Sequence, residues 1–471
     1  MPDQQGTRFT YRTVWRWHFY AGLFCIPFVV WLSITGGIYL FKTEIEAWLD
    51  QPYERIALSG VRQSGDALIR SALHAVPGST FLSYQLPVNA QSAVQILLGQ
   101  GANQYRAYVH PHTAQVVRVI REDQRPMRQL FYLHGELALG DKGSMLVELA
   151  ASWAVIMILN GLYLWSPQNI SQLPGSVSPG LSKRGRAFWK DLHSVTGLWI
   201  SAFALFLLFS GLPWAKSWGS YLKVFRAVTG AAGAQDWTTG RSSELAANLA
   251  VQREIRDASA HTHEGRGLTS EQLHKTPQNF APIDTMIASV SPLRLAYPAL
   301  ISPPHKSGGP WFARSDAPNR TLRSELTLDP DSGQILTRVD FNQRHWIDRA
   351  VGIGVAAHEG QLFGIWNQAI SLFTVFGLVL LSISALIMWW RRRPAGVLGA
   401  PNALAHSGIP KYLFLPVLIL AVYLPLFGLS MVIVFVAERM LFPRMPGMSR
   451  WLGLNDSSNR AEQVRLFGGS S

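Results

Sequence analysis

The stretch Tyr132-Leu133-His134-Gly135-Glu136-Leu137-Ala138-Leu139-Gly140 leads into an apolar run, and the chain repeats this arrangement at Ala357-His358-Glu359-Gly360-Gln361-Leu362-Phe363-Gly364. The interval from His134 to Trp165 equals the interval from His358 to Trp389. The register therefore holds across the whole apolar segment. Each copy predicts a histidine followed by a membrane-spanning helix.

A second pair of histidines occupies repeated positions in the other two apolar segments. His18 and His193 are each followed, at one and the same spacing, by a glycine, Gly36 and Gly211. Self-similarity over so long a period indicates an internal repeat. The four histidines together predict a duplicated unit of span, insert and span.

Composition favours a membrane protein. The chain has 471 residues, of which 48% are hydrophobic and only 15% charged, and about 20 apolar residues suffice to cross a bilayer core. Five windows fit: 19–41, 144–165, 194–215, 365–390 and 412–437. The first window is too long for a cleaved secretory signal, so we expect it to stay attached. The single cysteine, Cys25, excludes an internal disulfide and a cysteine-held iron–sulfur cluster.

The net charge of +13 is best explained by topology. Lysine and arginine do not gather on one periodic segment, which argues against nucleic acid as a partner. They concentrate in short segments near the span ends, so the positive-inside rule predicts a cytoplasmic N-terminus and two long inserts outside. The fifth span would leave Arg439, Arg444 and Arg450 outside, against that rule.

The resulting organisation has ten parts. They are the N-terminal arm and span 1 (1–42), insert 1 (43–133), span 2 (134–166), a cytoplasmic loop (167–192), span 3 (193–214), insert 2 (215–357), span 4 (358–393), a cytoplasmic loop (394–411), span 5 (412–438) and a C-terminal tail (439–471). Alternating strand patterns after a helix near 64–75 make insert 1 a small α+β module. A similar hairpin pattern ends insert 2, whereas residues 230–280 have the composition of an elaboration or a flexible connection.

The histidines form two pairs by membrane side. In this topology His18 and His193 share the cytoplasmic side, and His134 and His358 share the outer side. Two pairs of imidazoles at two depths are what two bis-histidine b-type haems need. A single such histidine would be explained as an interfacial residue, and the nearby glycines, Gly22 and Gly197 among them, suit either a flat macrocycle or close helix packing.

Other metal sites and proton-carrying groups are weaker hypotheses. His110 with His112, and His261 with His263, could bind zinc or copper, but surface histidines explain them better because no third ligand follows at a fixed spacing. Glu136 and Glu359 lie beside the outer histidines at different offsets. Glu148, inside span 2, is a candidate proton relay or a group that reaches water.

As a set, these motifs resemble the PepSY-associated transmembrane family. They are Trp17-His18 to Thr35-Gly36-Gly37, Leu133-His134 to Gly140, Asn160-Gly161-Leu162-Tyr163-Leu164-Trp165, Asp191-Leu192-His193 to Ser210-Gly211-Leu212, and Ala357-His358 to Met388-Trp389-Trp390-Arg391-Arg392-Arg393. The five apolar windows predict a mainly α membrane protein, a five-span bundle in which the fifth span is extra to the family's pattern. The resemblance implies a location in the bacterial inner membrane and two periplasmic α+β PepSY-like modules. It also implies that His18, His193, His134 and His358 are the axial ligands of two haems b.

Some family members are similar to haem-containing ferrisiderophore reductases. The resemblance therefore implies a di-haem oxidoreductase that passes electrons across the lipid bilayer to a ferric siderophore or another ferric chelate. Because no fused flavin domain is recognisable, we expect a separate donor, either a quinol or a cytoplasmic reductase. The alternatives are a non-enzymatic PepSY-domain sensor or regulator, a quinone-linked electron carrier, and a transporter, which the few polar groups in the spans disfavour.

Two further sets of residues have both a functional and a purely structural interpretation. Five basic residues could pair haem propionates or dock an acidic donor, although a role in topology alone is simpler: Arg12, Arg16, Lys183, Arg184 and Arg186. Trp311, Phe312 and Trp346 in insert 2 could offer apolar walls to a bulky substrate, although packing within the module is the simpler role.

Overall fold

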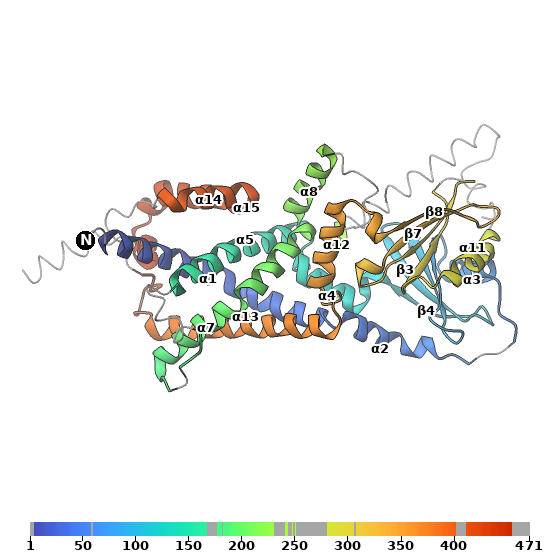
Figure 1. The fold of residues 1–471 in the computed structure, drawn as a ribbon, viewed down its shortest axis with the longest axis horizontal. Helices are drawn as coiled ribbons and strands as arrows, with labels where there is room; N and C mark the ends of the chain where they lie inside the picture. The colour runs from blue at the N-terminus through green and yellow to red at the C-terminus, as the bar shows by residue number, and fades with distance from the viewer. Residues whose placement is uncertain are drawn as a thin grey trace, which may run out of the picture. The chain divides into compact units, whose positions relative to one another are not determined.

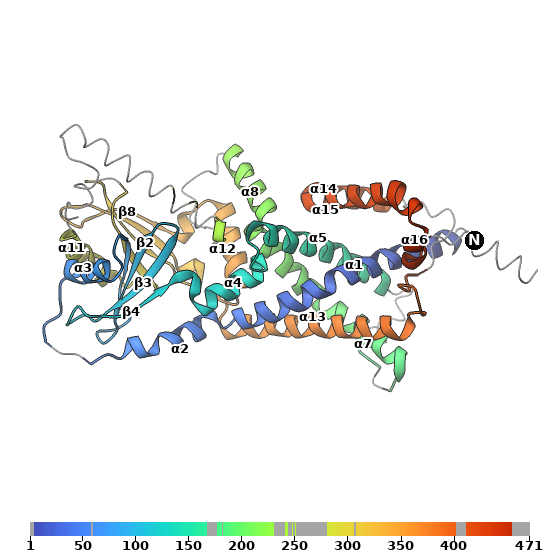
Figure 2. The same ribbon diagram turned by 180° about the vertical axis from the view of Figure 1, so that it is seen from behind.

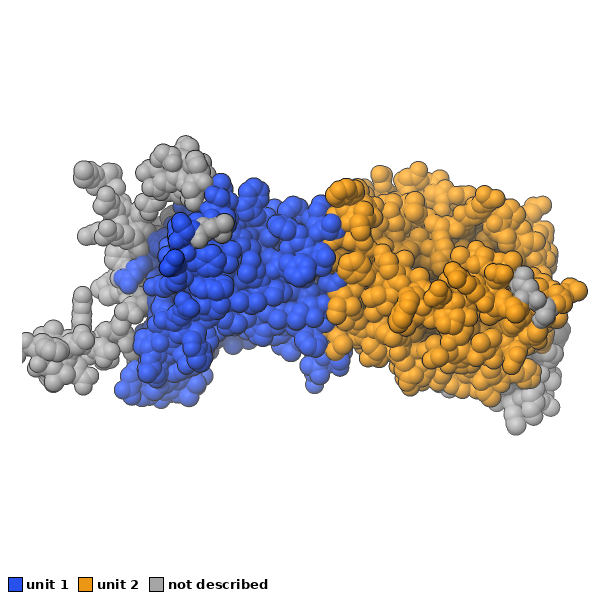
Figure 3. Space-filling view, turned by 90° about the horizontal axis from the view of Figure 1, so that it is seen from below, with its two compact units in different colours: residues 1–37, 134–225, 369–471 blue, residues 38–133, 226–368 orange. Residues whose placement is uncertain are grey.

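The structure is a computed structural model in which the chain forms two compact units. The helical unit comprises residues 1–37, 134–225 and 369–471, and the sheet unit comprises residues 38–133 and 226–368 (Figure 3). The structure describes residues 4–57, 60–166, 177–180, 182–229, 241–243, 247, 250, 280–305, 308–401 and 411–454. The predicted elaboration at 230–280 therefore lies almost entirely outside the described residues.

Long apolar helices build the helical unit (Figure 1). They are α1 (Gln4–Tyr39), α5 (Gly140–Trp165), α7 (Gly185–Gly211) and α13 (Ile365–Arg392), and the first and last of these extend a few residues into the sheet unit. Shorter helices are α8 (Lys216–Val228), α14 (Lys411–Tyr423), α15 (Pro425–Val436) and α16 (Pro446–Leu452). Single turns are η3 (Leu212–Trp214), η8 (Ala437–Leu441) and η9 (Phe442–Arg444).

Five helical segments among the described residues are long and apolar enough to cross a membrane. They are Tyr11–Tyr39, Gly140–Trp165, Gly185–Trp214, Ile365–Arg392 and Pro425–Arg444. A helix satisfies its polar backbone groups internally while apolar side chains face outward, as a lipid environment requires. The prediction of five apolar, span-length helices is confirmed, and the chain is a multi-pass membrane protein.

The fifth segment differs from its predicted bounds because it breaks at Leu424. This residue has a non-helical backbone (φ −114°, ψ 84°), and Pro425, which has no backbone N–H, begins a new helix, α15. Pro416, by contrast, lies within α14. Leu424 is buried with Ile156 of α5. The break is therefore held inside the bundle.

Both ends of the α14–α15 pair lie at the N-terminal end of α1. Upstream of the pair, the Leu398 N–H donates to the Trp451 carbonyl, 2.9 Å away, and Trp451 follows the pair. Arg16 of α1 donates to the carbonyls of Pro401 and Gly453, which flank the pair on either side. In Figures 1 and 2, α14 and α15 lie over the same stretch of the bundle. The pair thus enters and returns at one end of the helical unit, and the membrane side of the C-terminal arginines stays a prediction.

We expect the C-terminal segment to lie on the same membrane side as the N-terminus. A cysteine at Met448, in a chain with Cys25→Ser, should react with an impermeant maleimide from the side that labels Ser182→Cys. Met448 is exposed, so burial does not prevent the reaction. Labelling of Met448→Cys from the side that labels Ala90→Cys, an exposed position of the sheet unit, would show that α14–α15 crosses the membrane.

The sheet unit contains one eight-stranded antiparallel sheet in the order β4-β3-β2-β1-β5-β6-β7-β8. Its strands are β1 (Thr80–Gln85), β2 (Val94–Gln100), β3 (Asn103–Val109), β4 (Val116–Arg121), β5 (Ala299–Ser302), β6 (Trp311–Ser315), β7 (Ser324–Leu328) and β8 (Ile335–Asp340). Its helices are α2 (Lys42–Glu54), α3 (Gly65–Ala75), most of α4 (Pro126–Glu136), α11 (Pro282–Val290) and α12 (Trp346–His358), with turns η1 (Glu122–Gln124), η5 (Ser291–Leu293), η6 (Arg320–Leu322) and η7 (Phe341–Gln343).

Each insert supplies four consecutive strands and a helix that covers them, and the sheet joins the two sets. β1 pairs with β5 through Tyr84 with Ile301 and Gln85 with Leu300. Pairing removes two open edges that would otherwise expose unsatisfied backbone groups. The two α+β modules expected from the sequence therefore share a single sheet, a pairing that the strand patterns did not reveal.

One face of the sheet packs against α3 and α11 to form the core. Alternate residues of each strand point to this face, as the period of two requires, and Ile96 and Ile301 are fully buried there with Ile69 of α3 and Met286 of α11. Trp311, which the sequence suggested as a substrate wall, belongs to the same core. The simpler role weighed for it, packing within the module, is the one that the structure shows.

The other face of the sheet carries a buried polar cluster. Arg106 on β3 donates to Glu122 through Nε and Nη2, at 2.5 and 3.2 Å, and to Gln85 and Gln95 through Nη1. Burial alone would raise the pKa of Glu122, but the charge and hydrogen bonds of Arg106 outweigh it and lower that pKa to about 2. Glu122 is therefore ionised and contributes to stability at neutral pH.

Candidate functional site

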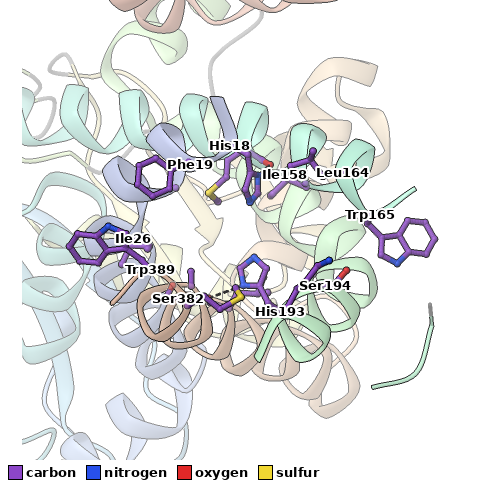
Figure 4. Close-up of a pocket in the computed structure, with 18 of the residues that line it drawn as sticks. His18, Phe19, Ile26, Ile158, Leu164, Trp165, His193, Ser194, Ser382 and Trp389 are labelled. Atoms are coloured by element: carbon purple, nitrogen blue, oxygen red, sulfur yellow. Dashed lines mark hydrogen bonds between the residues drawn. The ribbon is translucent and has the colours of Figure 1, made fainter. Parts of the chain in front are cut away.

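A cavity of about 420 Å³ lies inside the helical unit, between α1, α5, α7 and α13. His18 of α1 and His193 of α7 point toward each other across it (Figure 4). Its walls are mostly apolar, with aromatic side chains such as Phe19, Trp165 and Trp389 around the two imidazoles. Sequence reasoning paired His18 with His193, and the structure brings these two together.

The lining of the cavity follows the sequence repeat. His18 and His193 are separated by one fixed difference in residue number, the first offset, and Trp165 and Trp389 are separated by another, the second offset. With these two offsets, all lining residues except Val29, Leu378 and Arg392 form pairs. The pairs are 11/186, 15/190, 18/193, 19/194, 22/197, 23/198 and 26/201 from α1 and α7, and 157/381, 158/382, 161/385, 162/386, 164/388 and 165/389 from α5 and α13. Equivalent helix faces therefore form the two halves of the wall.

The distance between the two imidazoles suits one metal atom bound by both. The ring centres of His18 and His193 are 6.4 Å apart, and the ring planes meet at 84°. A metal–nitrogen bond of about 2 Å on each side places the centres of two ligating imidazoles roughly 6 Å apart. The two rings are therefore spaced as the axial ligands of one haem iron would be, with apolar space around them for a macrocycle.

Hydrogen bonds fix the protonation of both rings. Nδ1 of His18 lies 2.9 Å from the Met157 carbonyl, and Nδ1 of His193 lies 3.2 Å from the Leu381 carbonyl. A carbonyl oxygen only accepts, so each Nδ1 carries the hydrogen and each Nε2 has a free lone pair. Met157 and Leu381 are equivalent positions of the repeat. Orientation of an imidazole by a backbone carbonyl is the usual support for a metal-binding histidine.

Glycine gives His18 its space. A Cβ at Gly161 of α5 would lie 3.1 Å from Cε1 of His18, so a side chain there would displace the ring. Gly161 belongs to the motif that ends at Trp165, but the sequence analysis gave this glycine no role. Its position one helical turn before Trp165 could have indicated a role. Gly22 and Gly197, which it did consider, line the cavity at equivalent positions.

Basic side chains line one part of the cavity wall. Arg186 and Lys190 of α7 and Arg392 of α13 line it, and among the described lining residues none is acidic. The guanidinium of Arg392 also lies over the rings of Trp15 and Phe19, at 5.1 and 5.2 Å from their centres. Carboxylates of a bound group would find their counter-charges here.

Of the five basic residues considered for propionates, only Arg186 lines the cavity. Arg16 binds carbonyls near the C-terminal helix α16, and Lys183 pairs with Asp191 at 2.7 Å. Lys190 and Arg392 replace them as candidates. Sequence reasoning missed these two because their charges fitted the topology rule equally well.

The outer histidines belong to different units. His134, near the end of α4, lies in the helical unit, where its Nδ1 is 2.9 Å from Oγ1 of Thr35. Thr35 donates to the Trp31 carbonyl, and a Cβ at Gly36 would lie 2.9 Å from Cε1 of His134. His358 is the last residue of α12, in the sheet unit. The pairing of His134 with His358 stays a prediction.

Other candidate metal ligands have structural partners. The rings of His110 and His112 hydrogen-bond the carbonyls of Ala57 and Gly60, at 3.0 and 2.9 Å. Across the described ranges there is no group of three or more His, Cys, Asp or Glu side chains that could hold a metal ion. His261 and His263 lie outside the described residues. The structure gives no support to a zinc or copper site at the first of these pairs.

Glu148 supports the start of a helix. Its carboxylate accepts the backbone N–H groups of Ser217 and Trp218, at 2.9 and 3.1 Å. These are the first turn of α8, where unpaired N–H groups and the helix dipole favour an anion. The interaction supplies a structural reason for a carboxylate in this span.

The other two residues suggested as walls for a substrate have different surroundings. Phe312 packs against His305, and Trp346 is exposed.

A multi-pass helical unit joined to an antiparallel sheet defines the class of this protein. A family model described as "PepSY-associated TM region" matches residues 15–392, so the chain belongs to the PepSY-associated transmembrane family. The match covers all four histidines and every helix that lines the cavity. A comparison with curated proteins finds no match.

Proposed function

We propose that this chain is a haem-dependent membrane oxidoreductase that reduces a ferric chelate, a ferric siderophore being the leading candidate. The main support is the cavity between His18 and His193. Two imidazoles face one another at 6.4 Å with both Nδ1 atoms hydrogen-bonded at their backs. Haem b, when bound by two imidazoles, supplies one-electron transfer without ligand exchange at the iron.

The residues of the cavity have distinct roles in this proposal. His18 and His193 would hold the iron from opposite sides, and the apolar walls would exclude water from it. Arg186, Lys190 and Arg392 would bind the propionates. The pairing of lining positions supports a further part of the proposal, that the two halves of the chain are copies of one unit.

A second haem between His134 and His358 is part of the same proposal. It rests on the repeat in the sequence, which gives His134 and His358 the same register, and on the hydrogen bond with Thr35 Oγ1, which orients the His134 ring. Two haems at different depths would connect the two sides of a hydrocarbon core about 30 Å thick. The electron donor would be a quinol or a cytoplasmic reductase, and one electron would convert each ferric centre to ferrous.

The distribution of basic residues supports an orientation in the membrane. Arg186, Lys190 and Arg392 line the cavity beside His18 and His193, and the positive-inside rule places basic segments in the cytoplasm. We propose a bacterial inner-membrane location with a cytoplasmic N-terminus, the His18–His193 site on the inner side and both PepSY-like modules in the periplasm. The chelate would be released as a ferrous complex outside.

Anaerobic reoxidation tests the proposed reaction. The purified chain, reduced with dithionite and freed of excess reductant, is mixed with ferric siderophores in the presence of a ferrous-specific chelator. We expect the haem bands to reoxidise while one ferrous complex forms per electron lost. Haems that stay reduced with every ferric chelate but reoxidise with a quinone would identify a quinone-linked carrier instead.

A further inference from the structure

Ser384 makes the two imidazoles of the cavity unequal. His193 Nδ1 lies 2.9 Å from Oγ of Ser384, closer than its other acceptor, the Leu381 carbonyl at 3.2 Å. Ser384 is fully buried on α13 and donates its own hydrogen to the Leu381 carbonyl. Its lone pair is therefore the nearest acceptor for the His193 N–H. The three groups form a closed hydrogen-bonded triangle behind this ring.

Within the described chain, the other half of the cavity lacks a counterpart to this contact. The offset that relates Met157 to Leu381 relates Asn160 to Ser384. The amide nitrogen of Asn160 is buried and has no hydrogen-bond partner in the described part of the chain. Among the described residues, the Met157 carbonyl is the one acceptor for His18 Nδ1. The repeat preserves the carbonyl contact on both sides but supplies a hydroxyl on one side only.

We propose that Ser384 is a positioning residue that makes His193 the stronger donor to the bound iron and lowers the reduction potential of the inner haem. The inference rests on the proposed function and deepens it. Accepting a hydrogen bond from Nδ1–H moves electron density onto Nε2, which raises the basicity of the ligand. A more basic ligand stabilises ferric iron relative to ferrous iron. With Ser384, the haem held by His18 and His193 would therefore have a lower reduction potential than with the Leu381 carbonyl alone.

The test compares two hydroxyl side chains of the same helix. Ser384→Ala removes the hydroxyl next to His193, and Thr374→Val removes a buried hydroxyl that does not line the cavity and donates to the Ile370 carbonyl. Both replacements are small and occur at buried positions, so their effects on packing should be similar. The full-length chain is purified with its native haem, and haem content, the midpoint potential of each component and the electron paramagnetic resonance spectrum are measured.

We expect Ser384→Ala to raise the midpoint potential of one component and to change the g-values of its low-spin ferric signal, with haem content unchanged. The affected component should be the one that His193→Ala removes. Thr374→Val should match the wild type. Equal potentials and spectra in all three chains would overturn the role of Ser384, and so would loss of haem in Ser384→Ala alone. A wild-type chain without haem would instead overturn the proposed function.

Discussion

Replacement of His193 by alanine should remove one of two low-spin haem components and leave the other in place. His193 is the wall residue of α7 that faces His18 at 6.4 Å, and a haem iron with one imidazole becomes high-spin or is lost. His18→Ala should affect the same component, because both rings would bind the same iron. Where the haem is lost and not converted to high spin, haem content should fall by about half in that variant.

Reduced-minus-oxidised spectra of the histidine variants check this pairing. His134→Ala and His358→Ala should remove the remaining component, and His110→Ala, whose ring binds the Ala57 carbonyl, is the matched control that should change nothing. If His18→Ala and His134→Ala removed the same component, the assignment of the pairs would be wrong. Spectra unchanged in every variant would show that these histidines do not bind the haem.

Glu122→Gln should strongly destabilise the sheet unit. Arg106, which is mostly buried, would keep its charge and lose its carboxylate partner. Removing one partner from a buried ion pair costs about 3–5 kcal/mol. Asp66→Asn, which breaks the more exposed pair with Arg70, is the control and should change stability far less, because solvent screens an exposed pair.

The pH dependence of stability has a defined sign. The pKa of Glu122 falls from an ordinary value of 4.5 to about 2 in the folded unit. A carboxyl group with a lowered folded pKa stabilises the fold above its ordinary pKa. This contribution is lost as the pH falls from about 4.5 to about 2. In Glu122→Gln the sheet unit should lack that part of its acid sensitivity.

Alkylation of a buried cysteine at neutral pH reports the loss of stability, and the circular dichroism of the chain, followed as the pH is lowered, reports the acid sensitivity. With Cys25→Ser as background, Ala107→Cys places a thiol in the core of the sheet, where Ala107 is fully buried. Glu122→Gln should raise the rate of alkylation in mild urea by more than about 100-fold, the factor that corresponds to about 3 kcal/mol. A rate close to that of the parent would show that the cluster contributes little.

The sequence predicted the inner histidine pair because a repeat can be recognised from the order of the residues alone. His18 and His193 occupy the same register of two similar apolar segments, and both side chains line the cavity. The same logic gives Met157 and Leu381 their common role. The sequence did not lead us to these two positions, because a backbone carbonyl that accepts a hydrogen bond cannot be recognised from the pattern of side chains.

Other features depend on contacts that no local pattern contains. The apolar run 412–437 is long enough for a span, and the hydrogen bonds of Arg16 with Pro401 and Gly453 and of Leu398 with Trp451 show that its two ends meet. The pairing of β1 with β5 joins segments that lie in different inserts, far apart along the chain. The role of Ser384 likewise depends on a long-range contact, since a serine in an apolar helix usually bonds only its own backbone.

Whether the paired histidines hold haem b within the membrane is decided most directly by a reduced-minus-oxidised absorbance spectrum of the purified chain, with haem counted per polypeptide by the pyridine haemochrome method. We expect two haems per chain, with the sharp α-band of six-coordinate low-spin iron. A folded, membrane-extracted chain with no haem, even after growth with added haem precursor, would contradict this expectation and would favour a PepSY-domain sensor or regulator.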